Sequence, residues 1–311
     1  MRTLRIGSRG SALALWQANF VRDRLAPTGR GVEIEIIIIK TSGDRFQQGN
    51  VGRIGLKGVF IKELEDALLD ERVDLAVHSM KDVPTELPAG LAITAILERQ
   101  DVRDSLISQN GTKLAELPAG ARVGTSSLRR AAQLRRYRRD LNLQELRGNV
   151  DTRLRKLEQG QYDAIVLAKA GLDRLGWSNR ISEVIPPEIS LPAVGQGAIG
   201  VESRASDQEV AQILAALDHS ETRAGVLAER ALLAELQGGC QVPLGAWGRL
   251  EDGQLVLDAC VLSADGVECL RERAQGTAVD AERLGRDLAR RMLDAGAGRI
   301  LKLAGRNIGN G

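Results

Sequence analysis

Apolar residues recur with two different spacings along the first hundred residues. Short strand-like runs at 3–6, 32–39 and 73–77 are separated by segments with helical spacing, SALALWQANFVRDRL at 11–25 and VFIKELEDALL at 59–69. Strands that alternate with helices are typical of α/β folds with a parallel sheet. The pattern therefore predicts an α/β unit with a parallel sheet in this part of the chain.

The same alternation returns in the middle of the chain. RVGTS is followed by helix-like SLRRAAQLRRYRR, strand-like LQELR, helix-like VDTRLRKLEQ and strand-like YDAIVLA, so a second α/β unit is expected. Farther along, helix-like stretches at 207–217 and 221–236 precede strand-like segments at 244–250, 254–262 and 267–274 and an amphipathic helix at 280–294. Consecutive strands followed by a helix indicate a small α+β domain.

Composition excludes several classes of protein. The chain has 311 residues, 43% of them hydrophobic and 27% charged, which is enough for about two well-packed domains. Lys and Arg total 43 against 41 Asp and Glu, so a net charge of +2 produces no strong field toward nucleic acid or membrane. The apolar run at 36–39 is far shorter than the roughly 20 residues that span a bilayer.

The amino-terminal sequence and the cysteine content favour a reduced, cytoplasmic protein without a metal site. MRTLRIGSRG enters a strand-like segment directly and lacks the apolar stretch of a secretory signal. Cys240, Cys260 and Cys269 are too few and too irregularly spaced for a disulfide framework or a zinc site. Because the histidines are only His78 and His219, carboxylates must carry most proton chemistry.

The two α/β units open with similar turns, RIGSRGS and RVGTSS, which place small hydroxyl residues where a strand passes into a helix. Free backbone N–H groups and the helix dipole make such a turn suitable for an anion, with Ser11 or Ser126 and Ser127 as caps. Ordinary helix capping without a ligand explains either turn taken alone.

A second candidate site follows the strand-like segment VDLAVHS. It runs into Met80, Lys81 and Asp82, and Pro84 stops the extended pattern. This places the two charged residues at the carboxyl end of a strand, where open α/β sheets bind their ligands. An exposed turn with a local ion pair is the alternative from the residues alone.

Arginine is concentrated in the second α/β unit. A guanidinium grips a carboxylate or phosphate in bidentate fashion, so the cluster favours a polyanionic ligand. Most of these arginines fit a solvated helix face, but Arg129, Arg130, Arg147 and Arg153 lie beside a helix start or in turn-like sequence. Nucleic acid is the rival ligand, yet only 3% of the chain is aromatic, which argues against a base-stacking surface.

Two glycine-rich stretches carry further candidates. Cys240 lies in GGCQVP, and a thiolate there is able to form a stable thioether with an electrophilic carbon. An isolated cysteine is nonetheless most often a small buried apolar residue. The segment 41–58 contains five glycines, which favours a mobile lid over a regular element.

Six motifs occur in one order along the chain: IGSRGSALALWQA, VHSMKDVP, GTSSLRR, LRGNVDTRL, LPAVGQGA and GGCQVP. In these motifs and in their order the chain resembles the porphobilinogen deaminase family. The resemblance implies an α/β fold of two periplasmic-binding-protein-like lobes plus a small C-terminal α+β domain that carries the cofactor cysteine. It implies a first lobe at 1–97 with 198–215, a second at 103–191, and the C-terminal domain at 220–311.

The resemblance also implies a reaction of tetrapyrrole and heme biosynthesis. Members of the family are transferases that join four porphobilinogen molecules head to tail, with loss of ammonia, on a dipyrromethane cofactor and release hydroxymethylbilane. By motif position the cofactor would be attached through a thioether to Cys240, and Asp82 would be the catalytic carboxylate. A cytoplasmic monomer with porphobilinogen as its substrate is expected, and no nucleic acid, membrane or metal.

The acetate and propionate arms of each ring would require cationic and hydroxyl partners. By motif position these are Arg9, Ser11, Ser79, Lys81, Ser127, Arg129, Arg130, Arg147, Arg153, Lys57 and Arg53. Arg53 is a departure, because a lysine is expected there, although the positive charge is retained. Two alternatives stay open: a different transferase for acidic small molecules would not need Cys240, and a two-lobed anion-binding protein would not need Asp82.

Overall fold

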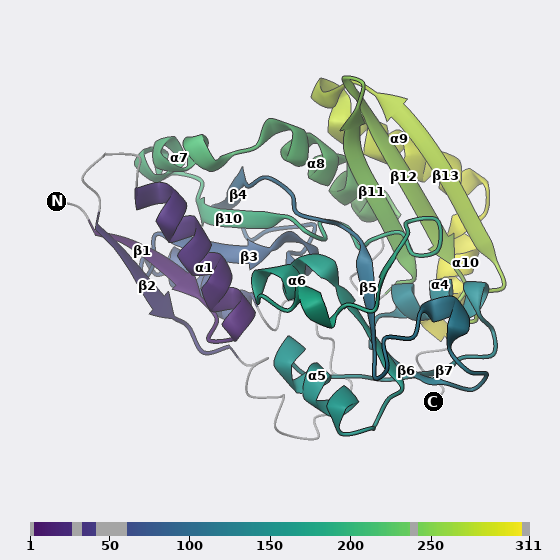
Figure 1. Ribbon diagram of the computed structural model, residues 1–311. Coiled ribbons are helices and arrows are strands. Elements are labelled where there is room, and N and C mark those ends of the chain that lie inside the picture. The colour runs from purple at the N-terminus through teal and green to yellow at the C-terminus, as the bar shows by residue number, and fades with distance from the viewer. Residues whose placement is uncertain (1–2, 27–32, 42–60, 237–241, 307–311) are drawn as a thin grey trace. The chain divides into compact units, whose positions relative to one another are not determined.

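The computed structural model describes residues 3–26, 33–41, 61–236 and 242–306 (Figure 1). The chain divides into two compact units, residues 1–99 with 198–223, and residues 100–197 with 224–311. The domain boundaries expected from sequence resemblance are finer than this division and stay predictions. The predicted lid at 41–58 lies, after Thr41, outside the described residues.

The first unit is built on a five-stranded sheet in the order β2-β1-β3-β10-β4. Its strands are β1 (Thr3–Ser8), β2 (Glu33–Ile38), β3 (Leu75–Ser79), β4 (Leu91–Ile96) and β10 (Ile199–Arg204), and its helices are α1 (Ala12–Leu25), α3 (Lys62–Leu69) and α7 (Gln208–Leu214). β1 is parallel to β2 and β3, whereas β10 is antiparallel to β3 and β4. The expected parallel arrangement is confirmed for β1, β2 and β3, whereas the returning strand β10, which lies far outside the first hundred residues, enters the sheet in the opposite direction.

Alternation along β3 explains how helices cover both faces of this sheet. Leu75 and Val77 belong to the core cluster that includes Ala18 of α1, while Ala76 belongs to a second cluster with Leu68 of α3. Successive side chains of a strand point to opposite faces. α1 and α3 therefore lie on opposite faces of the sheet and leave its strand ends free for polar residues.

The second unit contains another five-stranded sheet, in the order β7-β6-β8-β5-β9. Its elements are β5 (Asp104–Ser108), β6 (Arg122–Gly124), β7 (Asn142–Gln144), β8 (Ala164–Ala168), β9 (Glu183–Ile185), α4 (Leu128–Tyr137), α5 (Val150–Glu158) and α6 (Lys169–Arg174). β6 is parallel to β7 and β8, and β5 is antiparallel to β8 and β9, so this sheet is also mixed. Leu134 of α4 packs on one face and Leu154 of α5 on the other.

The C-terminal part of the second unit is a three-stranded antiparallel sheet covered by helices. It comprises most of α8 (Ser220–Glu235), whose first turn belongs to the first unit, and β11 (Leu244–Glu251), β12 (Gln254–Leu262), β13 (Cys269–Gly276), α9 (Ala281–Asp294) and α10 (Ala297–Arg306). Leu255 and Leu257 face the core formed with α8, α9 and α10, whereas Cys260 and Leu262 on the other face of β12 pack with Ala132 of α4. The predicted α+β character is confirmed, and α10 was not expected from the sequence.

Short 3-10 turns complete the described structure, at η2 (Met80–Asp82), η3 (Leu114–Glu116), η4 (Ser178–Arg180), η5 (Ala215–Leu217) and η6 (Ala278–Asp280). Three sheets in two α/β lobes and a small C-terminal domain confirm the predicted fold class. None of the helices in the described ranges is long and apolar enough to cross a membrane.

Candidate active site

Residues from two motifs meet at one edge of the first sheet. β1 and β3 are parallel neighbours in which Ile6 pairs with Leu75 and Gly7 with Ala76, so both strands end at the same edge. Arg9 and Ser11 follow β1, and Lys81 and Asp82 follow β3. The structure therefore brings together four residues that the sequence placed at two separate strand ends.

The turn that carries Lys81 and Asp82 is anchored by its buried neighbours. The backbone N–H of Met80 donates to the carbonyl of Ala198 at 3.0 Å, and the side chains of Met80 and Val83 are buried. Gly200 makes room for this anchor, because a Cβ built there would lie 2.2 Å from the Met80 sulfur. Asp82 is exposed, and within the described ranges no hydrogen bond or ion pair engages its carboxylate.

Helix α1 supports the same edge through two polar side chains. Ser11 caps the helix by accepting a hydrogen bond from the Ala14 N–H at 3.3 Å. Gln17 is buried, and its amide donates to the Ser79 hydroxyl at 2.7 Å, which fixes the end of β3. Sequence reasoning missed Gln17, although a polar residue at helical spacing between Ala14 and Val21 on an apolar face was a usable signal.

In the second unit, the strand ends meet at the start of α4. Asp104 opens β5 and pairs with Ala168 at the end of β8, since β5 and β8 are antiparallel. β6, which leads into α4, is parallel to β8. Asp104, Arg129 and Arg130 consequently gather at the carboxyl edge of β6 and β8.

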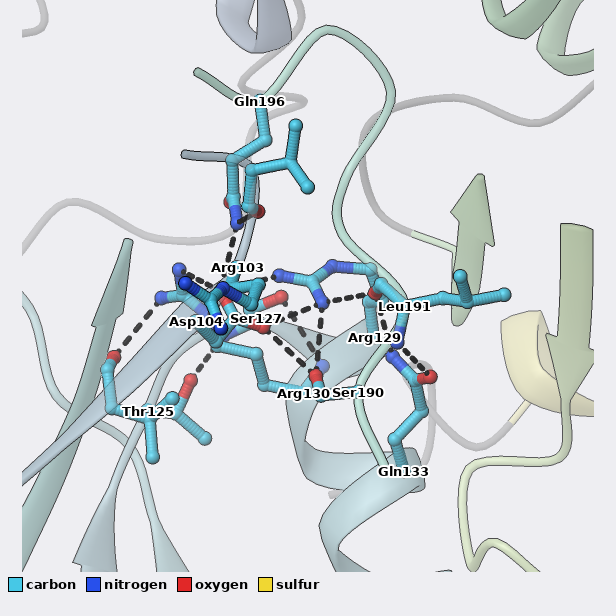
Figure 2. Close-up of polar contacts among 12 residues, drawn as sticks. Arg103, Asp104, Thr125, Ser127, Arg129, Arg130, Gln133, Ser190, Leu191 and Gln196 are labelled. Atoms are coloured by element: carbon cyan, nitrogen blue, oxygen red, sulfur yellow. Dashed lines mark hydrogen bonds and ion pairs between the residues drawn. The ribbon is translucent and has the colours of Figure 1, made fainter. Parts of the chain in front are cut away.

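Asp104 binds both arginines at the start of α4 (Figure 2). The Arg129 guanidinium donates to Oδ2 at 2.8 Å and Oδ1 at 3.2 Å, and the Arg130 Nε and Nη2 donate to Oδ1 at 3.0 and 2.8 Å. The relative exposures of Asp104, Arg129 and Arg130 are 0, 4 and 6%. The predicted carboxylate-binding pair thus has an internal carboxylate partner that sequence reasoning did not identify.

Neighbouring polar groups complete this network. Ser190 Oγ donates to Asp104 Oδ2 at 2.8 Å and Gln196 Nε2 to Oδ1 at 2.9 Å. Arg129 Nη1 also donates to the carbonyl of Leu191, and Arg130 Nη1 to that of Val166 at 3.0 Å. Four side chains therefore surround one carboxylate with six donor atoms, but Nε of Arg129 is buried without a hydrogen-bond partner among the described residues.

Electrostatics keep this carboxylate ionised. Burial alone would raise the pKa of the Asp104 carboxyl, but the positive charges of Arg129 and Arg130 hold it far below its usual range. Burial lowers the pKa of the Arg130 guanidinium, and Asp104 opposes that shift. Two guanidiniums against one carboxylate leave this trio with a net positive charge, which suits an additional anion.

The other residues expected to bind carboxylates lie around the helix starts of the second unit. Ser127 caps α4 by accepting from the Arg130 N–H at 3.4 Å. Arg147 is exposed and pairs with Glu145 at 2.7 Å, and Nε of Arg153 donates to the Gly148 carbonyl at 2.8 Å. Their expected role in binding a ligand stays a prediction.

Three predicted site residues, Arg53, Lys57 and Cys240, lie outside the described residues. Of the other two cysteines, Cys260 is buried, and its burial raises the pKa of its thiol to about 12, while Cys269 is half-buried. A thiol with so high a pKa is a poor nucleophile. In the described ranges no group of three or more His, Cys, Asp or Glu is arranged to hold a metal ion.

The first sheet presents an exposed carboxylate at a strand edge, and both sheets present cationic residues where strands end. These features define an α/β protein suited to small acidic ligands. The family model for porphobilinogen deaminase, dipyromethane cofactor binding domain, matches residues 4–212, and that for the porphobilinogen deaminase C-terminal domain matches 224–294. Porphobilinogen deaminase of Syntrophobacter fumaroxidans is 50% identical over 301 residues, which cover 97% of each chain. The chain belongs to the porphobilinogen deaminase family, as its sequence motifs predicted.

Solved structures similar to this chain include periplasmic binding domains. A VFT2 domain of Bordetella pertussis BvgS aligns with a TM-score of 0.41 and 14% identity over 69% of this chain and 86% of its own. A Salmonella typhimurium periplasmic binding protein with high arginine specificity aligns with a TM-score of 0.39 and 14% identity, over 70% and 92%. Both alignments are loose, so the fold class rests on the strand order and the family match.

Proposed function

We propose that this enzyme of tetrapyrrole biosynthesis joins four porphobilinogen molecules head to tail, releasing ammonia at each addition, and liberates hydroxymethylbilane. Membership of the family supports deaminase activity and a dipyrromethane cofactor. The structural observation that carries the finer proposal is the exposed Asp82 carboxylate, held on an anchored turn beside Arg9, Ser11 and Lys81.

The described residues fit a dipyrromethane group with acidic arms. Arg9 and Lys81 are cations and Ser11 is a hydroxyl donor, so they match acetate and propionate. The Asp82 carboxylate is the only one of these four that accepts but does not donate, which suits a pyrrole N–H. When bound, the cofactor supplies a nucleophilic pyrrole carbon, and by motif position Cys240 would hold it through a thioether.

Asp82 has the central chemical role. Loss of ammonia from porphobilinogen leaves an electron-poor methylene-pyrrolenine whose positive charge lies partly on the ring N–H. A carboxylate that accepts a hydrogen bond from that N–H stabilises the developing charge, as an oxyanion hole does with the opposite sign. The same carboxylate is placed to hold a proton for the leaving amine and to accept one from the ring carbon.

The arginines of the second unit serve the substrate's acidic arms. Each addition brings two more carboxylates, so the ligand gains negative charge as the chain grows. The excess positive charge of the buried trio around Asp104 and the exposed Arg147 are suited to this.

Turnover of porphobilinogen by the holoenzyme tests the proposal. We expect Asp82→Ala to lower kcat by at least about 100-fold with a smaller change in KM, because the lost interaction strengthens in the transition state. Glu86→Ala is the matched control, since Glu86 is an exposed carboxylate four residues farther along and should leave kcat unchanged. Near-normal turnover by Asp82→Ala, or an equal loss in Glu86→Ala, would overturn the assignment.

A further inference from the structure

We propose that Asp104 is a positioning residue, which holds the guanidiniums of Arg129 and Arg130 in the geometry that receives a substrate carboxylate. The inference rests on the proposed function, because it assigns those arginines to the acidic arms of porphobilinogen. Asp104 itself is fully buried and so acts through the arginines instead of touching the ligand.

The hydrogen-bond geometry supports a role in orientation. Oδ1 accepts from Nε and Nη2 of Arg130, the two adjacent donors of one guanidinium edge, while Oδ2 accepts from Arg129 Nη1. Contacts to two atoms of a planar guanidinium fix its plane as well as its position. Removing the Asp104 carboxylate would remove the one group that orients both guanidinium planes.

The donor count shows that the two arginines retain binding capacity. A guanidinium has five N–H donors. Arg130 uses one of them toward the Val166 carbonyl and two, on Nε and Nη2, toward Asp104. Nε of Arg129 is buried and has no hydrogen-bond partner in the part of the chain that the structure describes. A buried group with a net positive charge and unused donors is able to accept one more carboxylate, and Asp104 compensates only half of the positive charge.

The network also fixes the arginines relative to the two ends of the segment 100–197, which is the first of the two stretches of chain in the second unit. The chain enters this unit at residue 100 and leaves it at 197. Gln196 Nε2 donates to Asp104 and to the carbonyl of Val102 at 2.6 Å, so both segments are tied to the carboxylate. Asp104 therefore links the guanidiniums to both of these segments.

Kinetics of Asp104→Asn holoenzyme, with cofactor content verified by intact mass, test the inference. Asparagine keeps the shape but loses the charge and turns an N–H₂ toward other donors, so we expect KM for porphobilinogen to rise at least tenfold and kcat to fall less than threefold. Asp104→Glu retains the charge, so its KM should lie between those of the wild type and Asp104→Asn. A KM within threefold of the wild type in Asp104→Asn would overturn the inference.

Asp258→Asn is the matched control. Asp258 is also a buried carboxylate between two arginines, Arg249 and Arg273, but it lies on β12 of the C-terminal sheet. A merely structural effect predicts that both variants lower the melting temperature and leave KM unchanged. An equal rise of KM in Asp258→Asn would therefore contradict a positioning role for Asp104.

Two further measurements cover the remaining outcomes. If Asp104→Asn does not fold, Ser190→Ala provides a second test. It removes the hydrogen bond to Asp104 Oδ2 and the one accepted from Arg129 Nη1, but no charge, and we expect a two- to fivefold rise in KM. An unchanged KM would count against the inference. Phenylglyoxal, which modifies accessible guanidiniums, should label Arg129 and Arg130 at least five times faster in Asp104→Asn than in the wild type. Unchanged labelling would overturn the inference, whether or not the wild type consumes porphobilinogen. Failure of the wild type to consume porphobilinogen would instead overturn the proposed function.

Discussion

Gly197 in the LPAVGQGA motif offers a sharp test of the structure. Its φ of +89° lies in the left-handed region, and a Cβ built there would be 2.5 Å from the carbonyl oxygen of Gln100. The Gly197 carbonyl accepts from the Gln100 N–H at 3.2 Å and from Arg174 Nη2 at 2.8 Å. Gly197→Ala must therefore adopt an unfavourable backbone conformation and also disturb two hydrogen bonds.

Both costs have known magnitudes. The left-handed conformation costs a residue with a Cβ about 1–2 kcal/mol, and relief of the overlap by shifting backbone costs a further ~1–3 kcal/mol. Gly176→Ala separates the two contributions, because Gly176 has a φ of +72° but no atom within 4 Å of its added Cβ. The control should therefore lose only the conformational part.

Thermal unfolding followed by circular dichroism measures the difference. At roughly 3 °C per kcal/mol, we expect the melting temperature to fall by about 6–15 °C in Gly197→Ala and by about 3–6 °C in Gly176→Ala. Equal decreases in the two variants would refute the close approach of Gly197 to Gln100.

Three other variants probe buried polar groups. Burial and Glu202 raise the pKa of Glu65, so ionisation destabilises the fold as pH rises; Glu65→Gln should raise the melting temperature near neutral pH and leave it unchanged below pH ~4. Burial raises the pKa of Asp74, but hydrogen bonds from Arg5 outweigh this and lower it; Asp74→Asn should destabilise the protein at neutral pH, by an amount that shrinks as pH falls through the folded-state pKa. Ser127→Ala removes the cap of α4 and should lower the free energy of unfolding by about 1 kcal/mol in urea titrations.

The sequence predicted most elements of the fold, and its limits have physical causes. Periodicity identified α1 and α4, because each buries one face along its length. It did not reveal that β10 pairs with β3, since the two strands are more than a hundred residues apart and antiparallel pairing leaves no mark in a buried strand's composition. The same limit explains why the sequence did not reveal that both sheets are mixed.

The candidate site was predictable where chemistry follows a strand directly. Lys81 and Asp82 lie in the turn that follows the apolar strand β3, and the family motif indicated their role. Asp104 had no such signal, because a charged residue at a strand start is ordinary and its partners Arg129 and Arg130 lie 25 and 26 residues away. Only the packing of β5 beside β8 shows that these arginines share one carboxylate.

The central claim is that Cys240 carries a dipyrromethane group, and the intact mass of the purified protein tests it most directly. We predict a mass above that of the polypeptide by two condensed pyrrole units, with colour from an aldehyde reagent for pyrroles, and loss of both signals in Cys240→Ala. Cys269→Ala, which removes a half-buried cysteine of β13, should keep both. An unmodified mass in a fully active wild type, or added mass that persists in Cys240→Ala, would contradict the account.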